Sequence, residues 1–184
     1  LKNIETLESA AEDLNERLPP FDAAISRLGL MLFPSPSSAL KALQHVLKPD
    51  ARFAALVSTT PDNNPFMARS MAVLLRCAGK SPPKPGQPGV FALGGKGILE
   101  GLMRDSGLVQ IQTKLVTASL NLPSASHALE MMREAFGAYR AVVADLSDAE
   151  KSKAWNEVYE CHKQFEGVDG FGAQLEFIIG AGAK

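Results

Sequence analysis

Two apolar runs stand out in the first third of the chain. Residues 21–32 are apolar at all but three positions, and residues 53–57 form a second run. A run without alternation is typical of a strand buried on both faces. Between the two runs, apolar residues repeat at helical spacing over 40–47, and Pro49 ends the repeat. We therefore predict a buried strand over 21–28, a helix, and a second buried strand, with the two strands parallel because a helix joins them.

The same two periodicities continue to the end of the chain. Residues 109–115 alternate between apolar and polar positions, which predicts an edge or antiparallel strand with one buried face and one wet face. Ser147 followed by Glu150 fits a capping box at the start of the last helix. The further elements that the pattern predicts are a short strand at 1–7, helices at 66–78 and 98–103, a helical region at 124–166, and a strand at 175–179.

Composition narrows the class of protein. The chain has 184 residues, 46% of them hydrophobic and 21% charged, with a net charge of −1. This is the size and balance of one globular domain, and the charge favours neither a nucleic-acid partner nor an anionic membrane. No apolar run approaches the roughly 18 residues of a membrane span. The two cysteines, Cys77 and Cys161, form no metal-binding pattern, so we expect no metal site and interpret them as reduced thiols of a cytoplasmic protein.

Four segments carry a resemblance to a known family. They are FDAAISRLGLMLFPSPSSAL at 21–40, HVLKP with RFAALV within 45–57, ILEGLMRDSGLVQIQTKLV at 98–116, and VDGFGAQLEFIIGAGAK at 168–184. They resemble the fourth strand with its loop, the turn into strand five, the helix into strand six, and the terminal strand of class I S-adenosyl-L-methionine (SAM)-dependent methyltransferases. The likeness is greatest to the subgroup that resembles the ubiquinone and menaquinone biosynthesis methyltransferases.

The resemblance implies an α/β fold: a Rossmann-like methyltransferase sheet that lacks its first two strand-helix units. Residues 1–184 would form a single truncated domain, with a helical cap region at about 124–166 over the acceptor site. The missing units would carry the glycine-rich turn that holds the cofactor and the acidic residue that binds its ribose hydroxyls. No G-x-G-x-x-G occurs in the sequence, and LGGKG at 93–97 follows a loop rather than a strand.

The resemblance also implies which residues would contact SAM. Ala10, Ala11 and Glu12 match the family's Asp-Ala-Glu after strand three, but Ala10 stands where an aspartate accepts a hydrogen bond from the adenine amino group. Two roles are open for Glu12: a substitute for that aspartate, or part of a solvated acidic loop. The remaining cofactor residues lie at the end of the fourth strand, where parallel sheets bind ligands, and they are Ser26, Arg27 and Leu28. For Arg27 a surface salt bridge is the alternative.

The acceptor side of the site follows strand five. Asn63, Asn64 and Phe66 lie where the family binds its small-molecule methyl acceptor, although a turn with a helix cap would use the same residues. No catalytic base is evident, and this transfer depends mainly on in-line positioning. The expected function is the C-terminal part of a SAM-dependent small-molecule methyltransferase, impaired as this chain. The alternative is a non-catalytic binding or assembly module with a relict methyltransferase fold.

The implied fold leaves one strand edge without a neighbour. The strand at 21–28 would lose its pairing to strand one, and proteins seldom leave such an edge bare. The short strand at 1–7 is a poor filler for a buried slot, because it carries Lys2, Asn3 and Glu5. We therefore expect a homodimer through this edge.

Overall fold

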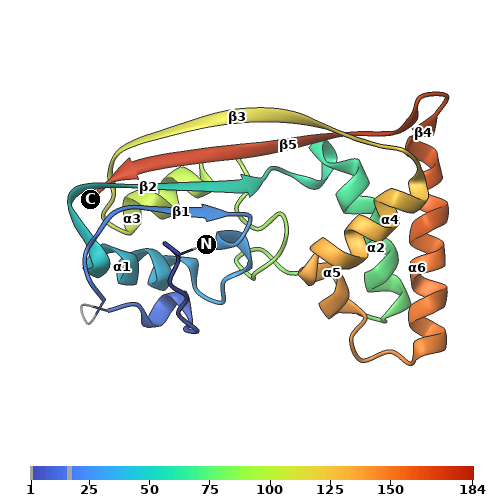
Figure 1. Cartoon of the computed structure of the whole chain (residues 1–184), viewed down its shortest axis with the longest axis horizontal. Coiled ribbons are helices and arrows are strands. Elements are labelled where there is room, and N and C mark those ends of the chain that lie inside the picture. Colours follow the sequence, from blue (N-terminus) through green and yellow to red (C-terminus); the bar gives the residue numbers. More distant parts are fainter. Residues whose placement is uncertain (1, 16–17) are drawn as a thin grey trace.

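A parallel pair of strands joined by a helix forms one side of the sheet (Figure 1). The computed structural model describes residues 2–15 and 18–184. β1 (Phe21–Arg27) leads through α1 (Pro36–Val46) into β2 (Leu47–Ser58), and the two strands pair in parallel. The strand, helix and parallel strand predicted from the apolar pattern are confirmed.

The C-terminal strand lies between β2 and an earlier strand. β5 (Gly170–Ala183) pairs antiparallel with β2 on one side and with β3 (Val109–Leu122) on the other, which gives the order β1-β2-β5-β3. The two-residue β4 (Glu166–Gly167) pairs only with the start of β5. The sheet is mixed and open, as expected for the α/β fold, and β3 is the antiparallel edge strand that its alternating sequence predicted.

Burial of the two edge strands differs from the sequence prediction. Ile25 in β1 is 83% exposed, and Leu115 and Val109 in β3 are 61% and 53% exposed. The prediction that β1 is buried on both faces is therefore wrong, because one set of its alternating side chains, which includes Ile25, lies on a face that is left exposed. β3 likewise exposes positions of its alternating pattern that we predicted to be buried.

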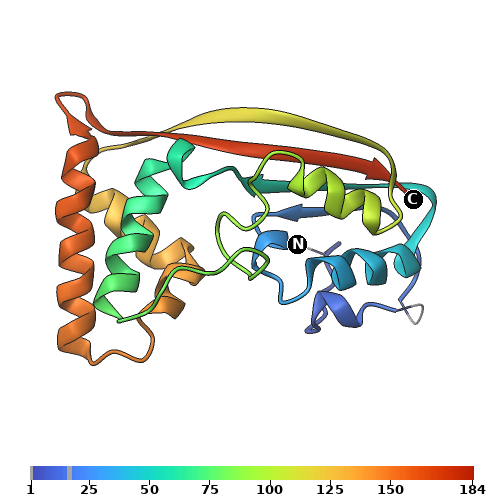
Figure 2. The same cartoon turned by 180° about the vertical axis from the view of Figure 1, so that it is seen from behind.

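Helices α1 and α3 lie on the same face of the sheet. α3 (Ile98–Asp105) packs Leu99 and Met103 against Gly180 of β5, where a Cβ atom would lie 2.8 Å and 2.9 Å from these side chains. α1 contacts α3, and Figure 2 shows α3 in front of the strands in the view from behind. Because side chains alternate along a strand, Ile179 points to the opposite face.

The remaining helices form a cluster at the far end of the long β3 and β5 strands (Figures 1 and 2). The capping box of Ser147 and Glu150 is present at the start of its last helix. The cluster consists of α2 (Pro65–Cys77), α4 (Ala125–Ala135), α5 (Gly137–Val142) and α6 (Asp148–His162). Short 3-10 turns lie at η1 (Ala11–Asp13), η2 (Leu30–Leu32), η3 (Pro61–Asn63) and η4 (Lys163–Phe165).

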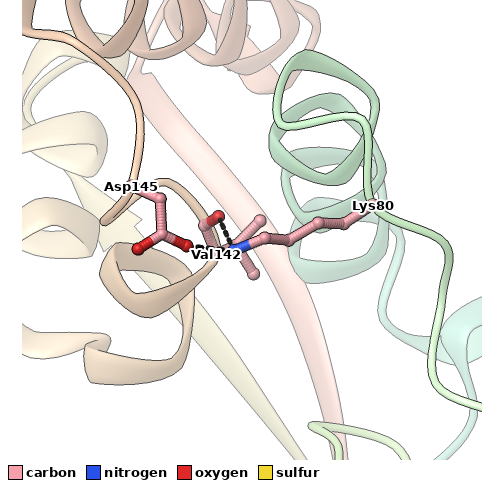
Figure 3. A network of polar contacts seen from close by, with 3 residues as sticks. All are labelled: Lys80, Val142 and Asp145. Atoms are coloured by element: carbon pink, nitrogen blue, oxygen red, sulfur yellow. Dashed lines mark hydrogen bonds and ion pairs between the residues drawn. The ribbon is translucent and has the colours of Figure 1, made fainter.

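Buried and surface contacts join α2 to α5 within the helical cluster. The buried Tyr139 hydroxyl donates to the Met67 carbonyl at 3.1 Å, and burial raises the pKa of Tyr139. On the surface, Lys80 donates to the Val142 carbonyl at 2.9 Å and pairs with Asp145 at 3.1 Å (Figure 3). The long connection after α2 is thereby held against the end of α5.

The N-terminal stretch does not form the strand predicted for residues 1–7. Leu1 lies outside the described residues, and residues 2–10 form no strand and are exposed. Their polar and charged side chains offer little apolar surface to a sheet. η1 packs instead on α1. Among the described residues, no helix has the length and apolar character needed to cross a membrane.

Candidate functional site at the ends of the parallel strands

β1 and β2 end at the same edge of the sheet because they run parallel. β1 ends at Arg27 and β2 ends at Ser58. In open α/β sheets, ligands bind beyond the carboxyl ends of parallel strands. This edge faces the side on which the helical cluster lies (Figure 1). It is therefore the place where the fold would hold a small molecule.

The chain turns sharply as it leaves β1. Leu28 donates its N–H to the Leu56 carbonyl at 2.9 Å and adopts φ 58°, a left-handed conformation that costs a leucine about 1–2 kcal/mol. The Ser26 hydroxyl oxygen accepts from the N–H of Leu30 at 3.0 Å, which stabilises the turn. Three of the predicted cofactor residues thus form one turn at the carboxyl edge.

Arg27 is exposed on the outer face of β1. The ion pairs within the described part of the chain do not include Arg27, so the salt bridge considered from the sequence is not seen there. The guanidinium group is therefore available to a ligand or to another chain.

A glycine-containing loop closes on both strand ends. The N–H of Gly89 donates to the Met31 carbonyl at 3.0 Å, beyond the end of β1. A Cβ atom at Gly94 would overlap the backbone of Ser58 and Thr59 at the end of β2. Only glycine allows this approach without a shift of the backbone. The LGGKG stretch therefore packs at the candidate site, a role that its isolated position in the sequence did not indicate.

The N-terminal group of predicted cofactor residues lies against α1. The Glu12 carboxylate accepts from the N–H of Ser35 at 3.0 Å, so it binds the segment that follows β1. Beside it is a groove of about 500 Å³. The groove is lined by Glu12, Asp13, Leu14, Asn15, Ser38, Lys41, Ala42 and His45. Ser26, Arg27 and Leu28 do not line it, so the two predicted groups do not share this groove.

The predicted acceptor residues take different positions. Asn63 is exposed, and its side-chain N–H donates to the Glu176 carboxylate at 2.5 Å. Asn64 is fully buried: its Nδ2 donates to Thr59 Oγ1 at 3.0 Å, and its Oδ1 accepts from the N–H of Glu176 at 2.9 Å. Asn64 therefore ties the end of β2 to β5. Contact of either residue with a methyl acceptor stays a prediction.

Phe66 belongs to a buried aromatic cluster between α2, α6 and β5. Its side chain is fully buried, and its ring centroid lies 4.9 Å from that of His162 and 5.3 Å from that of Phe171. Contact of Phe66 with a methyl acceptor likewise stays a prediction, whereas its packing against the rings of His162 and Phe171 belongs to the core of the fold.

His162 completes this cluster as a buried polar group. Ser70 donates its hydroxyl to the Phe66 carbonyl at 2.8 Å, so it accepts from Nε2–H of His162 at 3.0 Å. Burial lowers the pKa of His162 to about 4, although a hydrogen bond with the backbone of Ala125 acts to raise this pKa. The imidazole is therefore neutral at physiological pH.

The buried imidazole leads to a pH prediction. Between pH 7 and pH 5, His162 is expected to reduce the free energy of unfolding by about 2 kcal/mol. Unfolded, the imidazole titrates near 6.5, whereas folded it stays neutral down to about pH 4. The unfolded state binds more protons in this window, so stability is lost as the pH falls. Urea unfolding at several pH values measures the loss, and His162→Gln should remove it. Parallel pH profiles for the two proteins would contradict the assignment.

A second groove lies on the helical cluster, away from the strand ends. Its volume is about 690 Å³, and all its lining residues come from α4 to α6 and their connections. The described residues contain no group of three or more His, Cys, Asp or Glu side chains placed to hold a metal ion.

The fold, unlike the sequence, matches known proteins. The sequence matches no family model and no curated protein. A candidate methyltransferase from Bacillus halodurans aligns with 96% of this chain and 69% of its own, at a TM-score of 0.53 and 14% identity. The YcgJ protein from Bacillus subtilis aligns over 95% and 68%, at a TM-score of 0.51 and 17% identity. The chain shares the class I methyltransferase fold.

A further solved structure is less similar. A SAM-dependent methyltransferase from Thermotoga maritima, described as a possible histamine N-methyltransferase, aligns with 100% of this chain and 65% of its own, at a TM-score of 0.47 and 16% identity. At identities this low, the comparisons establish the methyltransferase fold and nothing finer. The resemblance to the ubiquinone and menaquinone subgroup stays a prediction.

Proposed function

We propose that this chain is the acceptor-side part of a SAM-dependent small-molecule methyltransferase. The observation that carries the proposal is the methyltransferase fold, matched over nearly the whole chain, with a turn at the carboxyl end of β1 where such a sheet would hold a ligand. When bound, SAM would supply a methyl group from its sulfonium to an oxygen, nitrogen or carbon nucleophile. The chain's part in this reaction is to position the two molecules in line.

The residues present fit only part of SAM. The turn at Ser26–Leu28, where Arg27 is exposed and Ser26 and Leu28 are half-buried, is suited to the methionine end of the molecule, and Glu12 and Asp13 place carboxylate acceptors in the groove beside α1. No described strand is followed by a glycine-rich turn into a helix, and Ala10 cannot accept from an adenine amino group. We therefore expect incomplete recognition, and impaired activity of the 184 residues alone.

The second candidate is a non-catalytic binding or assembly module. Two of the three predicted acceptor residues, Asn64 and Phe66, are buried in this structure and serve the fold itself. A domain that keeps the methyltransferase fold without its reaction would keep these contacts. The two candidates differ in whether the carboxyl edge binds SAM at all.

Calorimetric titration with SAM tests the proposed function. We expect a dissociation constant weaker than about 10 μM, which corresponds to a binding free energy less favourable than about −7 kcal/mol. Arg27→Ala should weaken the binding further, whereas Arg104→Ala, which alters an exposed arginine on α3, should not. A constant below about 10 μM would refute incomplete recognition, and no heat at millimolar SAM would favour the non-catalytic module.

A further inference from the structure

The groove on the helical cluster has a volume of about 690 Å³, which is typical of small-molecule sites. Its lining residues all fall between positions 126 and 155, on α4, at the end of α5 and on α6. α4 contacts both of the other helices (Figure 1). One continuous stretch of the described chain therefore sets the shape and the chemistry of this groove. The residues that line it take no part in the turn at the carboxyl edge, so what it binds does not rest on the proposed function.

Three cationic side chains line the groove, one from each helix. They are Arg133 on α4, Arg140 on α5 and Lys151 on α6. The ion pairs within the described part of the chain include none of the three. Arg140 is held in place through Nη1, which donates to the Arg133 carbonyl at 2.7 Å and to the Glu134 carbonyl in the last turn of α4. Lys151 is half-buried, and a partly desolvated ammonium group without a carboxylate partner favours an anion beside it.

Apolar surface lies beside these cations. The guanidinium carbon of Arg133 lies 6.0 Å from the centroid of the Trp155 ring, a cation–π contact that turns this side of α4 toward α6. Leu129 is one turn before Arg133 and belongs to the same row of side chains. Trp155 and Val143 are buried and Leu129 is half-buried, and all three line the groove. The inner side of the groove thus combines apolar side chains with positive charge.

Two carboxylates also line the groove, but they lie on its outer side. Glu130 and Glu134 are one turn apart on α4, and each directly follows a residue of the row that faces α6. One residue corresponds to a rotation of about 100° around a helix, so the carboxylates are turned away from that row. Both glutamates are exposed. They would repel an extended polyanion such as nucleic acid or an anionic membrane, so the arrangement favours a single small anion.

We propose that the groove binds a small carboxylate with an apolar body. The carboxylate pairs with Arg133, Arg140 and Lys151, since guanidinium and ammonium groups form charge-assisted hydrogen bonds to such oxygens. The apolar body lies against Leu129 and Trp155. This site is separate from the carboxyl edge at which β1 and β2 end.

Tryptophan fluorescence tests the site directly, because Trp155 is the only tryptophan of the chain. Octanoate is the probe, and it should change the emission saturably, with a dissociation constant below about 1 mM. Octylammonium has the same alkyl chain and the opposite charge, and it should bind at least about tenfold more weakly. No saturable change with octanoate, or an equal response to octylammonium, would overturn the proposal.

A charge reversal on α6 tests where the carboxylate binds. Lys151→Glu should weaken octanoate binding at least about tenfold, because it sets a like charge in the groove. The variant should keep its circular dichroism spectrum, since acidic residues are favourable near the N-terminus of a helix. Lys153→Glu is the matched control: Lys153 is exposed on the same helix and does not line the groove. Its octanoate affinity should stay within about twofold of wild type, because solvent screens exposed charges. Equal weakening by both variants would indicate general attraction by positive charge and would overturn the proposal.

Discussion

Replacing Phe66 by alanine is expected to lower the free energy of unfolding by about 3–5 kcal/mol, because the change leaves a cavity in a well-packed core. The Phe66 side chain is fully buried, and it contacts the rings of His162, Phe165 and Phe171. These rings come from α6, the turn after it, and the start of β5. Loss of the central ring would therefore loosen the join between the helical cluster and the sheet. Urea unfolding followed by circular dichroism measures the effect.

Phe21→Ala is the matched control for this substitution. Phe21 is 43% exposed and lies at the edge of the sheet, outside the buried core. Its loss should cost about 1 kcal/mol or less at a protein concentration low enough to exclude association. If the two phenylalanine variants lost equal stability, Phe66 would not be the centre of the aromatic cluster.

The second large effect is expected at Asn64. Asn64→Ala should cost about 2–4 kcal/mol, because it removes the hydrogen bonds of a fully buried side chain and leaves the N–H of Glu176 without its acceptor. The partners include Thr59 Oγ1, and both the N–H and the carbonyl of Glu176. These groups lie where β2 ends and where β5 passes it, so the candidate site should also lose its order.

The neighbouring Asn63→Ala is the control for Asn64. Asn63 is exposed and its side chain donates to the Glu176 carboxylate at the surface, so the loss of this side chain should change stability by no more than about 0.5 kcal/mol. Chemical denaturation of both variants separates the two roles. A near-neutral Asn64→Ala would show that the buried hydrogen bonds do not hold the strand ends together.

Local patterns predicted the elements of this fold well. The parallel pair of β1 and β2 followed from two apolar runs with a helical repeat between them, and the capping box followed from the spacing of Ser147 and Glu150. Both signals lie within a short stretch of chain. The burial of β1 could not be predicted in this way, because burial depends on neighbouring elements on both sides. An apolar strand at an uncovered edge has the same sequence as one in the interior.

The contacts of the site residues also could not be predicted from local patterns in the sequence. The polar loop before α2 drew attention to Asn64 and Phe66, but their partners Glu176 and His162 are far away in the sequence. Only the folded chain shows that both side chains are held inside it. Gly94 is a similar case, because its need for glycine arises from the backbone of Ser58 and Thr59. The position of Ser26, Arg27 and Leu28 at the end of a strand could be predicted because a local apolar run defines that strand, which ends at Arg27, while their contact with SAM stays a prediction.

The most direct test of the proposed methyltransferase site is an NMR titration of the isotope-labelled chain with SAM. Saturable shifts are expected at millimolar SAM in the amide signals of Ser26, Arg27 and Leu28, with smaller changes near Glu12. Titration with adenosine alone is the control and should leave the signals of Arg27 and Leu28 in place, because the methionine part is absent. Shifts confined to the groove on α4 to α6, or no shifts at all, would contradict a SAM site at the carboxyl end of β1.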